Sequence, residues 1–146
     1  MKRDNQRSRV YKAEGIPLEC EMTLSECAEF AGATCKKAKR DIYRLFPELK
    51  DRIDGRTIKV KDGRGRRKAC FDPNVWAIKL PRWSRSKQVV CHEVAHAYAY
   101  MLSPRPAWHG REFAGIYLLL VKHGLGEEAY RDLRKRFCQG RVDFKC

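Results

Sequence analysis

The stretch Cys91-His92-Glu93-Val94-Ala95-His96-Ala97 lies inside an apolar run that continues to Leu102. On an α-helix, residues four positions apart lie on the same face, so His92 and His96 direct two imidazoles at one point. This is the arrangement that a tetrahedral zinc ion needs from its first two ligands. Glu93 follows about 100° round the helix. From there its carboxylate reaches a water molecule on the metal without binding the metal, which is the position of a general base in zinc-dependent hydrolysis.

The side chains around this motif predict a helix with one buried face. Those on the side away from His92 are Cys91, Val94, Ala95, Tyr98, Met101 and Leu102. Ser84 or Ser86 precedes the stretch and is a suitable N-cap. The alternative is a helix that carries two histidines by chance, with Glu93 as a solvated charge.

A third ligand has to come from elsewhere, because a catalytic zinc usually takes three protein ligands and leaves one position for water. Of the four histidines in the chain, His109 follows His96 by thirteen residues. Residues 103–106 contain two prolines and would end the first helix, while apolar residues at helical spacing from Phe113 onward predict a second one. Two helices joined by a short break can bring His109 to the other two histidines. Glu112, one turn further on, is the alternative third ligand.

We interpret the remaining histidine and the cysteines as structural. His123 stands before Gly124 near the expected end of the second helix, where a cation suits the helix dipole. The seven cysteines include no C-x-x-C pair, which a structural zinc site usually needs. We expect reduced thiols, several of them buried. Cys91 points to the back of the motif helix, which argues against a nucleophilic role.

The segments HEVAHAY (92–98) and WHGREF (108–113) resemble the SprT-like zinc metallopeptidases, the group that contains the bacterial SprT proteins and the eukaryotic Spartan protease. The pattern of that family is HExxH, a short spacer, and a third histidine in an HGxxF-type motif that opens the next helix. Carried over, His92, His96 and His109 would bind one catalytic Zn²⁺, and Glu93 would be the general base. The chain also resembles small phage and actinobacterial metallohydrolases. It lacks the four-cysteine zinc ribbon that SprT proteins often carry.

The resemblance implies hydrolysis of peptide bonds in proteins, with DNA-associated proteins among the expected substrates. Tyr100, on the Glu93 side of the helix, is a candidate donor to the developing oxyanion. The motif alone indicates only metal-assisted hydrolysis. Two alternatives therefore remain open: a zinc-dependent hydrolase of a non-peptide substrate, and a basic nucleic-acid-binding module whose zinc is structural.

Charge is distributed unevenly along the chain, whose net charge is +14. Residues 1–88 carry 23 basic and 12 acidic side chains, whereas residues 89–146 carry 9 and 6. Such asymmetry is what binding to a phosphate backbone requires. The candidate contacts to nucleic acid are Lys36, Lys37, Arg64, Arg66, Arg67 and Lys68. The competing interpretation is a solvated surface, with the strand cations preventing edge pairing.

Length and composition indicate one globular domain. The chain has 146 residues, 43% of them hydrophobic, and no apolar run approaches the ~20 residues that cross a bilayer. The first residues lack the apolar region of a signal peptide. We expect a monomer with no membrane partner, located in the cytoplasm of a bacterium or of a phage-infected host. We divide it into a flexible basic arm (1–15) and a single SprT-like domain (16–146).

The elements expected along the chain give an α+β fold. Thr23-Leu24-Ser25-Glu26 is a capping box that opens a helix, Gly32 marks a break or a weak point, and a second helical stretch covers about 34–46. Three strands at 57–61, 66–71 and 75–80 form an antiparallel meander with a hairpin turn at 62–65.

The predicted fold class is thus a minimal, zincin-like domain with N-terminal helices, a three-stranded antiparallel sheet, the HExxH helix and the helices that follow. The last of these helices runs from Glu127 to about Phe137. In zincins a strand upstream of the motif helix commonly forms the upper rim of the cleft. By that resemblance, Val75–Leu80 would pair with an extended substrate.

Overall fold

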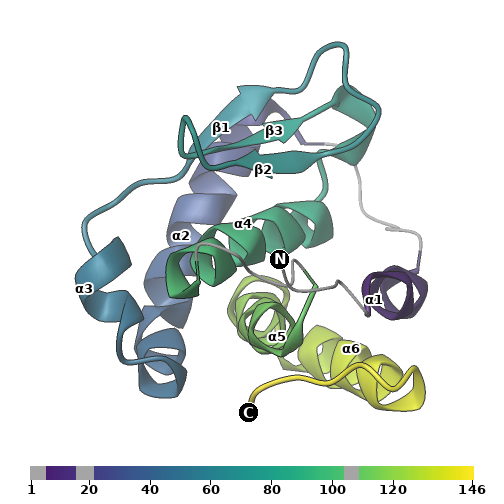
Figure 1. The fold of residues 1–146 in the computed structure, drawn as a ribbon. Helices are drawn as coiled ribbons and strands as arrows, with labels where there is room; N and C mark the ends of the chain where they lie inside the picture. Colours follow the sequence, from purple (N-terminus) through teal and green to yellow (C-terminus); the bar gives the residue numbers. More distant parts are fainter. Residues whose placement is uncertain (1–5, 16–21, 104–108) are drawn as a thin grey trace.

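The computed structural model describes residues 6–15, 22–103 and 109–146. These residues form an α+β fold with a small three-stranded sheet on one side and helices on the other (Figure 1). Helix α4 (Lys87–Leu102) runs under the sheet, and α5 (Arg111–Leu125) packs against it from the opposite side. Because α4 is buried from Val90 to Ala99, it forms the centre of the core.

The two ends of α4 agree with the sequence prediction. Ser86 is its N-cap, and the Ser86 hydroxyl accepts a hydrogen bond from the backbone N–H of Val89 at 3.2 Å. The helix ends at Leu102, ahead of the proline-containing segment 103–106, most of which lies outside the described residues. Helix α5 begins two residues after His109, so this histidine stands at the entrance of α5.

Helix α2 (Leu24–Leu45) is continuous, whereas the sequence predicted a break or a weak point at Gly32 and a second helical stretch after it. The predicted capping box is present: the Thr23 hydroxyl accepts from the N–H of Glu26, and the Glu26 carboxylate accepts from the N–H of Thr23, each at 3.1 Å. The buried stripe of α2 comprises Cys27, Ala31, Thr34, Ala38 and Ile42. Gly32 is exposed beside this stripe. A glycine inside a helix costs only about 0.5–1 kcal/mol, which the continuous buried stripe outweighs.

The sheet is mixed, so the predicted antiparallel meander is wrong. Strand β3 (Ala77–Leu80) lies in the middle, parallel to β1 (Lys59–Asp62) and antiparallel to β2 (Cys70–Asp72). The hairpin expected at 62–65 does not pair β1 with β2. Instead, the N–H of Gly63 donates to the carbonyl of the last residue of β3 at 3.1 Å, and the chain passes to the other side of β3 before β2 begins.

This strand order changes which strand is open to a partner. Val75–Leu80 was predicted to pair with a substrate, but β3 already has a neighbour on each edge. Among the described strands, β1 and β2 are the outer ones. Since β1 contacts α2 and β2 contacts α4, the outer strand on the α4 side is β2.

Arg7–Glu14 form helix α1, where the sequence predicted a flexible basic arm over residues 1–15. Val10 and Ala13, three positions apart, are buried, and α1 packs against α6 (Glu127–Gln139). The sequence gives little signal for this helix, because its buried side carries only these two apolar residues. The residues before position 6 lie outside the described part of the chain.

The C-terminal tail holds α1 in place. The Gln6 side chain donates to the backbone carbonyl of Asp143 at 2.9 Å and accepts from the N–H of Asp143 at 3.0 Å. Arg9 donates to the carbonyl of Arg141 at 3.2 Å, and Val142 beside it is buried. The two ends of the chain are therefore joined by specific hydrogen bonds.

The remaining elements are short or agree with expectation. Helix α3 spans Leu49–Ile53 and the 3-10 helix η1 spans Arg82–Ser84, and α6 covers the predicted last helix. Every described cysteine is a free thiol, as predicted. Within the described ranges, no helix combines the length and the apolar character needed to cross a membrane. The expected single domain over residues 16–146 stays a prediction.

Candidate metal centre

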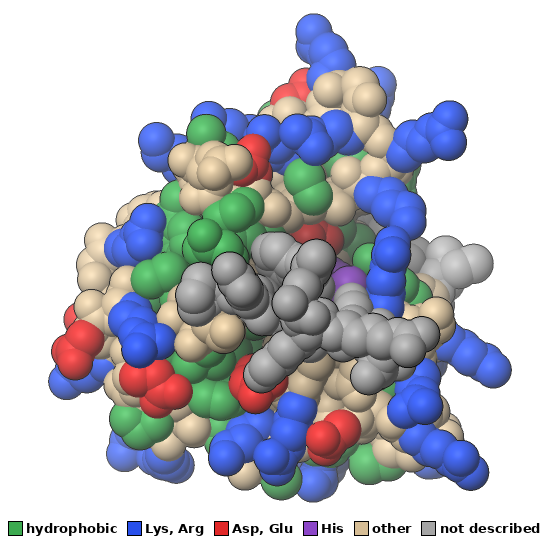
Figure 2. Space-filling model, in the orientation of Figure 1, with side chains coloured by type: hydrophobic (Ala, Val, Ile, Leu, Met, Phe, Trp, Pro, Cys, Tyr) green, Lys and Arg blue, Asp and Glu red, His purple; other side chains and the backbone are tan. Residues whose placement is uncertain are grey.

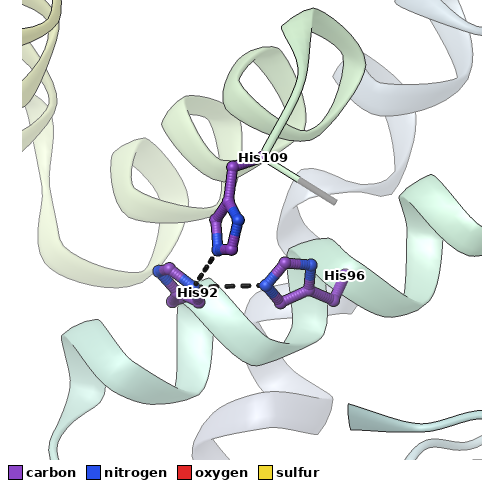
Figure 3. Close-up of side chains that lie close together, drawn as sticks. All are labelled: His92, His96 and His109. Carbon is purple, nitrogen blue, oxygen red and sulfur yellow. Dashed lines mark hydrogen bonds between the residues drawn. The ribbon is translucent and has the colours of Figure 1, made fainter. Parts of the chain in front are cut away.

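Two histidines of α4, His92 and His96, and His109, which lies just before α5, point toward one another (Figure 3). The Nε2 atom of His92 lies 3.2 Å from Nε2 of His96 and 3.3 Å from Nε2 of His109. One ligand atom from each of the three lies within 4.8 Å of the other two, and all three residues are buried. The cluster could therefore hold a metal ion.

The distances between these nitrogens fit a tetrahedral ion. Two nitrogens bound to one zinc ion at about 2.0–2.1 Å in tetrahedral geometry lie about 3.3 Å apart. The two distances from His92, 3.2 and 3.3 Å, agree with that value. Three nitrogen ligands leave the fourth position for water or substrate.

Phe113 fixes the orientation of the imidazoles from one side. It is fully buried on α5, one turn after His109. Its ring stacks on that of His96 with centroids 4.4 Å apart and planes at 24°, and lies edge-on to His92 at 5.0 Å. The phenylalanine of the WHGREF segment thus has a physical role, because it limits the rotation of two candidate ligands.

Glu93 is buried beside the cluster, with 7% of its surface exposed. Burial raises the pKa of its carboxyl group, the neighbouring His92 opposes this, and Glu14 adds to it, so that the pKa lies at about 7. A carboxyl group with such a pKa can both accept and release a proton near neutral pH.

A second carboxylate, which sequence reasoning missed, contacts the cluster from α1. Glu14 Oε2 lies 2.9 Å from Nδ1 of His92 and accepts a hydrogen bond from the Tyr117 hydroxyl at 2.7 Å. Burial disfavours the charged form of His92, but the nearby Glu14 carboxylate outweighs this and raises the pKa of the imidazole. The one local signal for this helix was the spacing of Val10 and Ala13.

Tyr11 is the second site residue supplied by α1. Its ring stacks on His92 with centroids 5.6 Å apart and planes at 16°, and lies 5.1 Å from the ring of His109. Burial raises the pKa of the Tyr11 hydroxyl, with a further contribution from Glu93, so the phenol stays protonated at neutral pH. Helix α1 therefore covers one side of the histidine cluster.

The charges at this site favour a cation. Glu14 Oε1 is buried and has no hydrogen-bond partner among the described residues, and Glu93 is buried close by. Burying a carboxylate without a compensating charge is unfavourable. A divalent cation among the three imidazoles would balance both groups, so the residues present fit a metal ion.

A cavity of about 280 Å³ opens beside the cluster. The described residues that line it are Tyr11, Glu14, Gly15, Lys68, Ala69, Trp83, Val89, His92 and Glu93. Trp83 is 67% exposed, which is unusual for so large an apolar side chain and places an aromatic surface at the mouth of the cavity. A substrate group can therefore reach Glu93 and His92 along a mostly apolar wall.

The predicted nucleic-acid contacts are exposed and lie in two segments, residues 64–68 next to the sheet and Lys36 and Lys37 on α2. Lys and Arg side chains surround much of the face shown in Figure 2. Arg64 and Arg66 line a hollow of about 580 Å³ together with Arg82 and Arg85, next to the sheet. Arg67 directly follows Arg66 and is exposed, and Lys68 lines the cavity at Glu93. On α2, Lys36 lines a separate hollow beside α3, and Lys37 is exposed.

Three further candidates lie outside the cluster. Glu112, the alternative third ligand, is exposed. His123 lies 2.7 Å from Asp41 of α2, and their hydrogen bond holds the pKa of Asp41 below its usual range, which agrees with a structural role. Tyr100 packs near Phe71 with ring centroids 6.0 Å apart and does not line the cavity at Glu93.

The fold and the cluster define an α+β protein with a candidate three-histidine metal centre, formed by two residues of α4 and by His109 just before α5. Residues 66–128 match the model of the SprT-like family, which confirms the resemblance predicted from HEVAHAY and WHGREF. The matched stretch contains β2, β3, α4, α5 and all three histidines, but not α1. No curated protein and no solved structure matches the chain.

Proposed function

We propose that the chain is a zinc-dependent peptidase of the SprT-like type. The proposal rests on one observation above the others: three Nε2 atoms converge next to the buried Glu93, which lines a cavity. The match of residues 66–128 to the SprT-like family supports the peptide bond as the target.

The residues divide the chemistry between them. A zinc ion held by His92, His96 and His109 would supply a Lewis acid that polarises the substrate carbonyl and lowers the pKa of a water molecule. Glu93, buried beside the three imidazoles, would accept a proton from the attacking water as the water oxygen bonds to the carbonyl carbon. It would then pass this proton to the amine nitrogen as the C–N bond breaks. Tyr11, protonated and on the cavity wall, is a better candidate donor to the oxyanion than Tyr100.

The cavity and the sheet support an extended peptide as the substrate. The cavity wall formed by Ala69, Trp83 and Val89 would accept an apolar side chain. Strand β2 leads into this wall, since Ala69 directly precedes it. An extended peptide would then pair with the outer edge of β2 by strand addition.

We also propose that DNA-associated proteins are among the substrates. The support is the excess of positive charge in residues 1–88 and the hollow lined by four arginines next to the sheet. Replacing Arg64 and Arg66 by alanine should weaken binding to single-stranded DNA. It should also make the slope of log K against log salt concentration shallower, by the loss of about one phosphate contact per residue. Filter-binding titrations at several salt concentrations measure both quantities, and the double variant Arg131→Ala/Lys135→Ala on α6 is the control of equal charge.

The test of the peptidase proposal is cleavage of an unstructured basic protein by the zinc-loaded chain, with and without single-stranded DNA. Glu93→Gln should lower the rate by about 10²–10⁴-fold, because it removes the general base, and should retain zinc. Glu112→Gln changes an exposed carboxylate close to the site and should leave the rate unchanged.

Each outcome selects one function. Cleavage that requires Glu93 and rises with DNA supports the peptidase and the DNA association together. Cleavage that is indifferent to DNA supports the peptidase alone. A zinc-loaded chain that cleaves no protein contradicts the proposal. Activity on small substrates would then indicate a hydrolase of another class. DNA binding that is unchanged in the Glu93→Gln variant would indicate a binding module with a structural zinc.

A further inference from the structure

We infer that helix α1 belongs to the metal centre and that its Glu14 is the positioning residue which fixes the imidazole of His92 for metal binding. The inference deepens the proposed function and rests on it. It concerns residues that lie outside both the HExxH motif and the stretch matched by the family model.

The tautomer of His92 follows from its two contacts. Nε2 of His92 faces the nitrogens of His96 and His109 at 3.2 and 3.3 Å, so this atom has to be free of a proton to bind a metal. The proton then resides on Nδ1, which donates to Glu14 Oε2 at 2.9 Å. A carboxylate in this position fixes the ring orientation and makes the ligating nitrogen more basic.

Glu14 is itself held by α4, which carries His92 and His96, and by α5, which follows His109. Tyr117, fully buried on α5, donates its hydroxyl hydrogen to the same Oε2 atom at 2.7 Å. Gln88 on α4 donates its side-chain N–H to the backbone carbonyl of Glu14 at 3.3 Å. Because side chain and backbone are both fixed, Glu14 has little freedom to turn away from His92.

The rest of α1 is fixed from the opposite end of the chain. Gln6 exchanges two hydrogen bonds with the backbone of Asp143, and Arg9 donates to the carbonyl of Arg141. These contacts are distant from the histidines but determine where α1 lies. A substitution of Gln6 should therefore alter the position of α1 and, through Glu14, the orientation of the His92 imidazole.

The first experiment measures zinc affinity by competition with a chromophoric chelator, using the full-length chain near neutral pH. Glu14→Ala should weaken zinc binding by about 10–100-fold, the usual effect of losing such a partner. Glu14→Gln has the same size but no charge and should weaken binding by roughly tenfold, at the lower end of that range. Lys12→Gln changes an exposed residue of the same helix and should bind zinc like the unaltered chain.

The second experiment reads the hydrogen bond directly. In the zinc-loaded chain, Nδ1–H of His92 should give a slowly exchanging, downfield proton signal in a spectrum of the ¹⁵N-labelled protein, and Glu14→Gln should shift it while Glu14→Ala abolishes it. Gln6→Ala should weaken zinc binding by a few-fold and broaden this signal.

The outcomes separate this inference from the proposed function. If the unaltered chain binds no zinc, the proposed metal site and the inference both fail. If it binds zinc and Glu14→Gln binds zinc equally well, with the His92 signal unchanged, the inference is overturned while the peptidase proposal stands. Because Glu14→Gln preserves the shape of the side chain, this result is available even where Glu14→Ala does not fold.

Discussion

The candidate metal centre draws on two regions that are built in different ways. Helix α4 and the residues just before α5 place three histidines close together in sequence, since His92 and His109 are 17 positions apart. Helix α1 contributes Glu14, which lies 78 positions before His92 in the sequence. The position of α1 depends in turn on hydrogen bonds to Arg141 and Asp143. The first region carries the candidate ligands, and the second restrains one of them.

The two regions therefore contribute differently to metal binding. Helical spacing alone brings His92 and His96 together, so their geometry survives any change that leaves α4 folded. Glu14 meets His92 only when α1, α5 and the C-terminal tail pack together. Damage to α4 or α5 should therefore abolish metal binding, and damage to α1 should only weaken it.

The largest expected effect comes from removing a ligand in the first region. His109→Ala leaves two imidazoles, and zinc binding should fall by more than the 10–100-fold expected for a residue such as Glu14 that only supports a ligand. Peptidase activity should be lost with it. Isothermal titration of the metal-free chain with zinc measures the effect.

Two variants on α5, the helix that follows His109, control for this result. His123→Ala removes a histidine that pairs with Asp41 and should keep zinc affinity. Glu112→Ala tests the alternative ligand and should also keep it. Loss of zinc in Glu112→Ala, with retention in His109→Ala, would contradict the three-histidine centre.

An intermediate effect is expected on the stability of the metal-free chain as pH changes. The folded chain binds a proton on Glu93 up to about pH 7, whereas an ordinary glutamate releases it near 4.5. Between these values the folded state holds more protons than the unfolded state, so stability falls as pH rises, by about 3 kcal/mol in total. The raised pKa of His92 acts in the same direction, because the stability it contributes at low pH is lost as pH rises through that pKa.

Urea unfolding of the metal-free chain at pH 5 and pH 8 measures this difference. Glu93→Gln should remove most of it, and zinc should reverse the sign by favouring the carboxylate. A metal-free chain that becomes more stable between pH 5 and pH 8 would contradict the raised pKa of Glu93 in the folded state.

The smallest effect is expected far from both regions. Thr23→Ala removes one half of the capping box of α2 and should lower the free energy of unfolding by about 1 kcal/mol. Zinc affinity should stay unchanged, because α2 supplies no described residue of the centre. Ser25→Ala, an exposed change two residues on, should alter neither quantity. A fall in zinc affinity in Thr23→Ala would mean that general destabilisation, rather than local geometry, controls the metal site.

Sequence reasoning succeeded where short-range rules apply. The capping box at Thr23, the N-cap at Ser86 and the end of α4 before the prolines were all predictable from neighbouring residues. The approach of His109 to α4 was predictable as well, because a short break between two helices leaves few arrangements. These features account for the three candidate ligands and Glu93.

Sequence reasoning failed where contacts between residues far apart in the sequence determine the structure. The order of the strands depends on whether Gly63 turns back on β1 or bonds to the end of β3, and the sequence of the turn does not distinguish them. Helix α1 carries a weak apolar pattern and gains its position from α6 and the tail. Tyr11 and Glu14 could therefore not be assigned to the site before the structure was known.

The central claim is that three imidazole nitrogens hold one metal ion, and X-ray absorption at the zinc edge tests it most directly. After one equivalent of zinc is added to the metal-free chain, the account predicts a first shell of nitrogen or oxygen donors at about 2.0–2.1 Å with histidine scattering behind it. With seven cysteines in the chain, thiolates are the natural competitors. A sulfur shell at about 2.3 Å, or a spectrum unchanged by His109→Ala, would contradict the account.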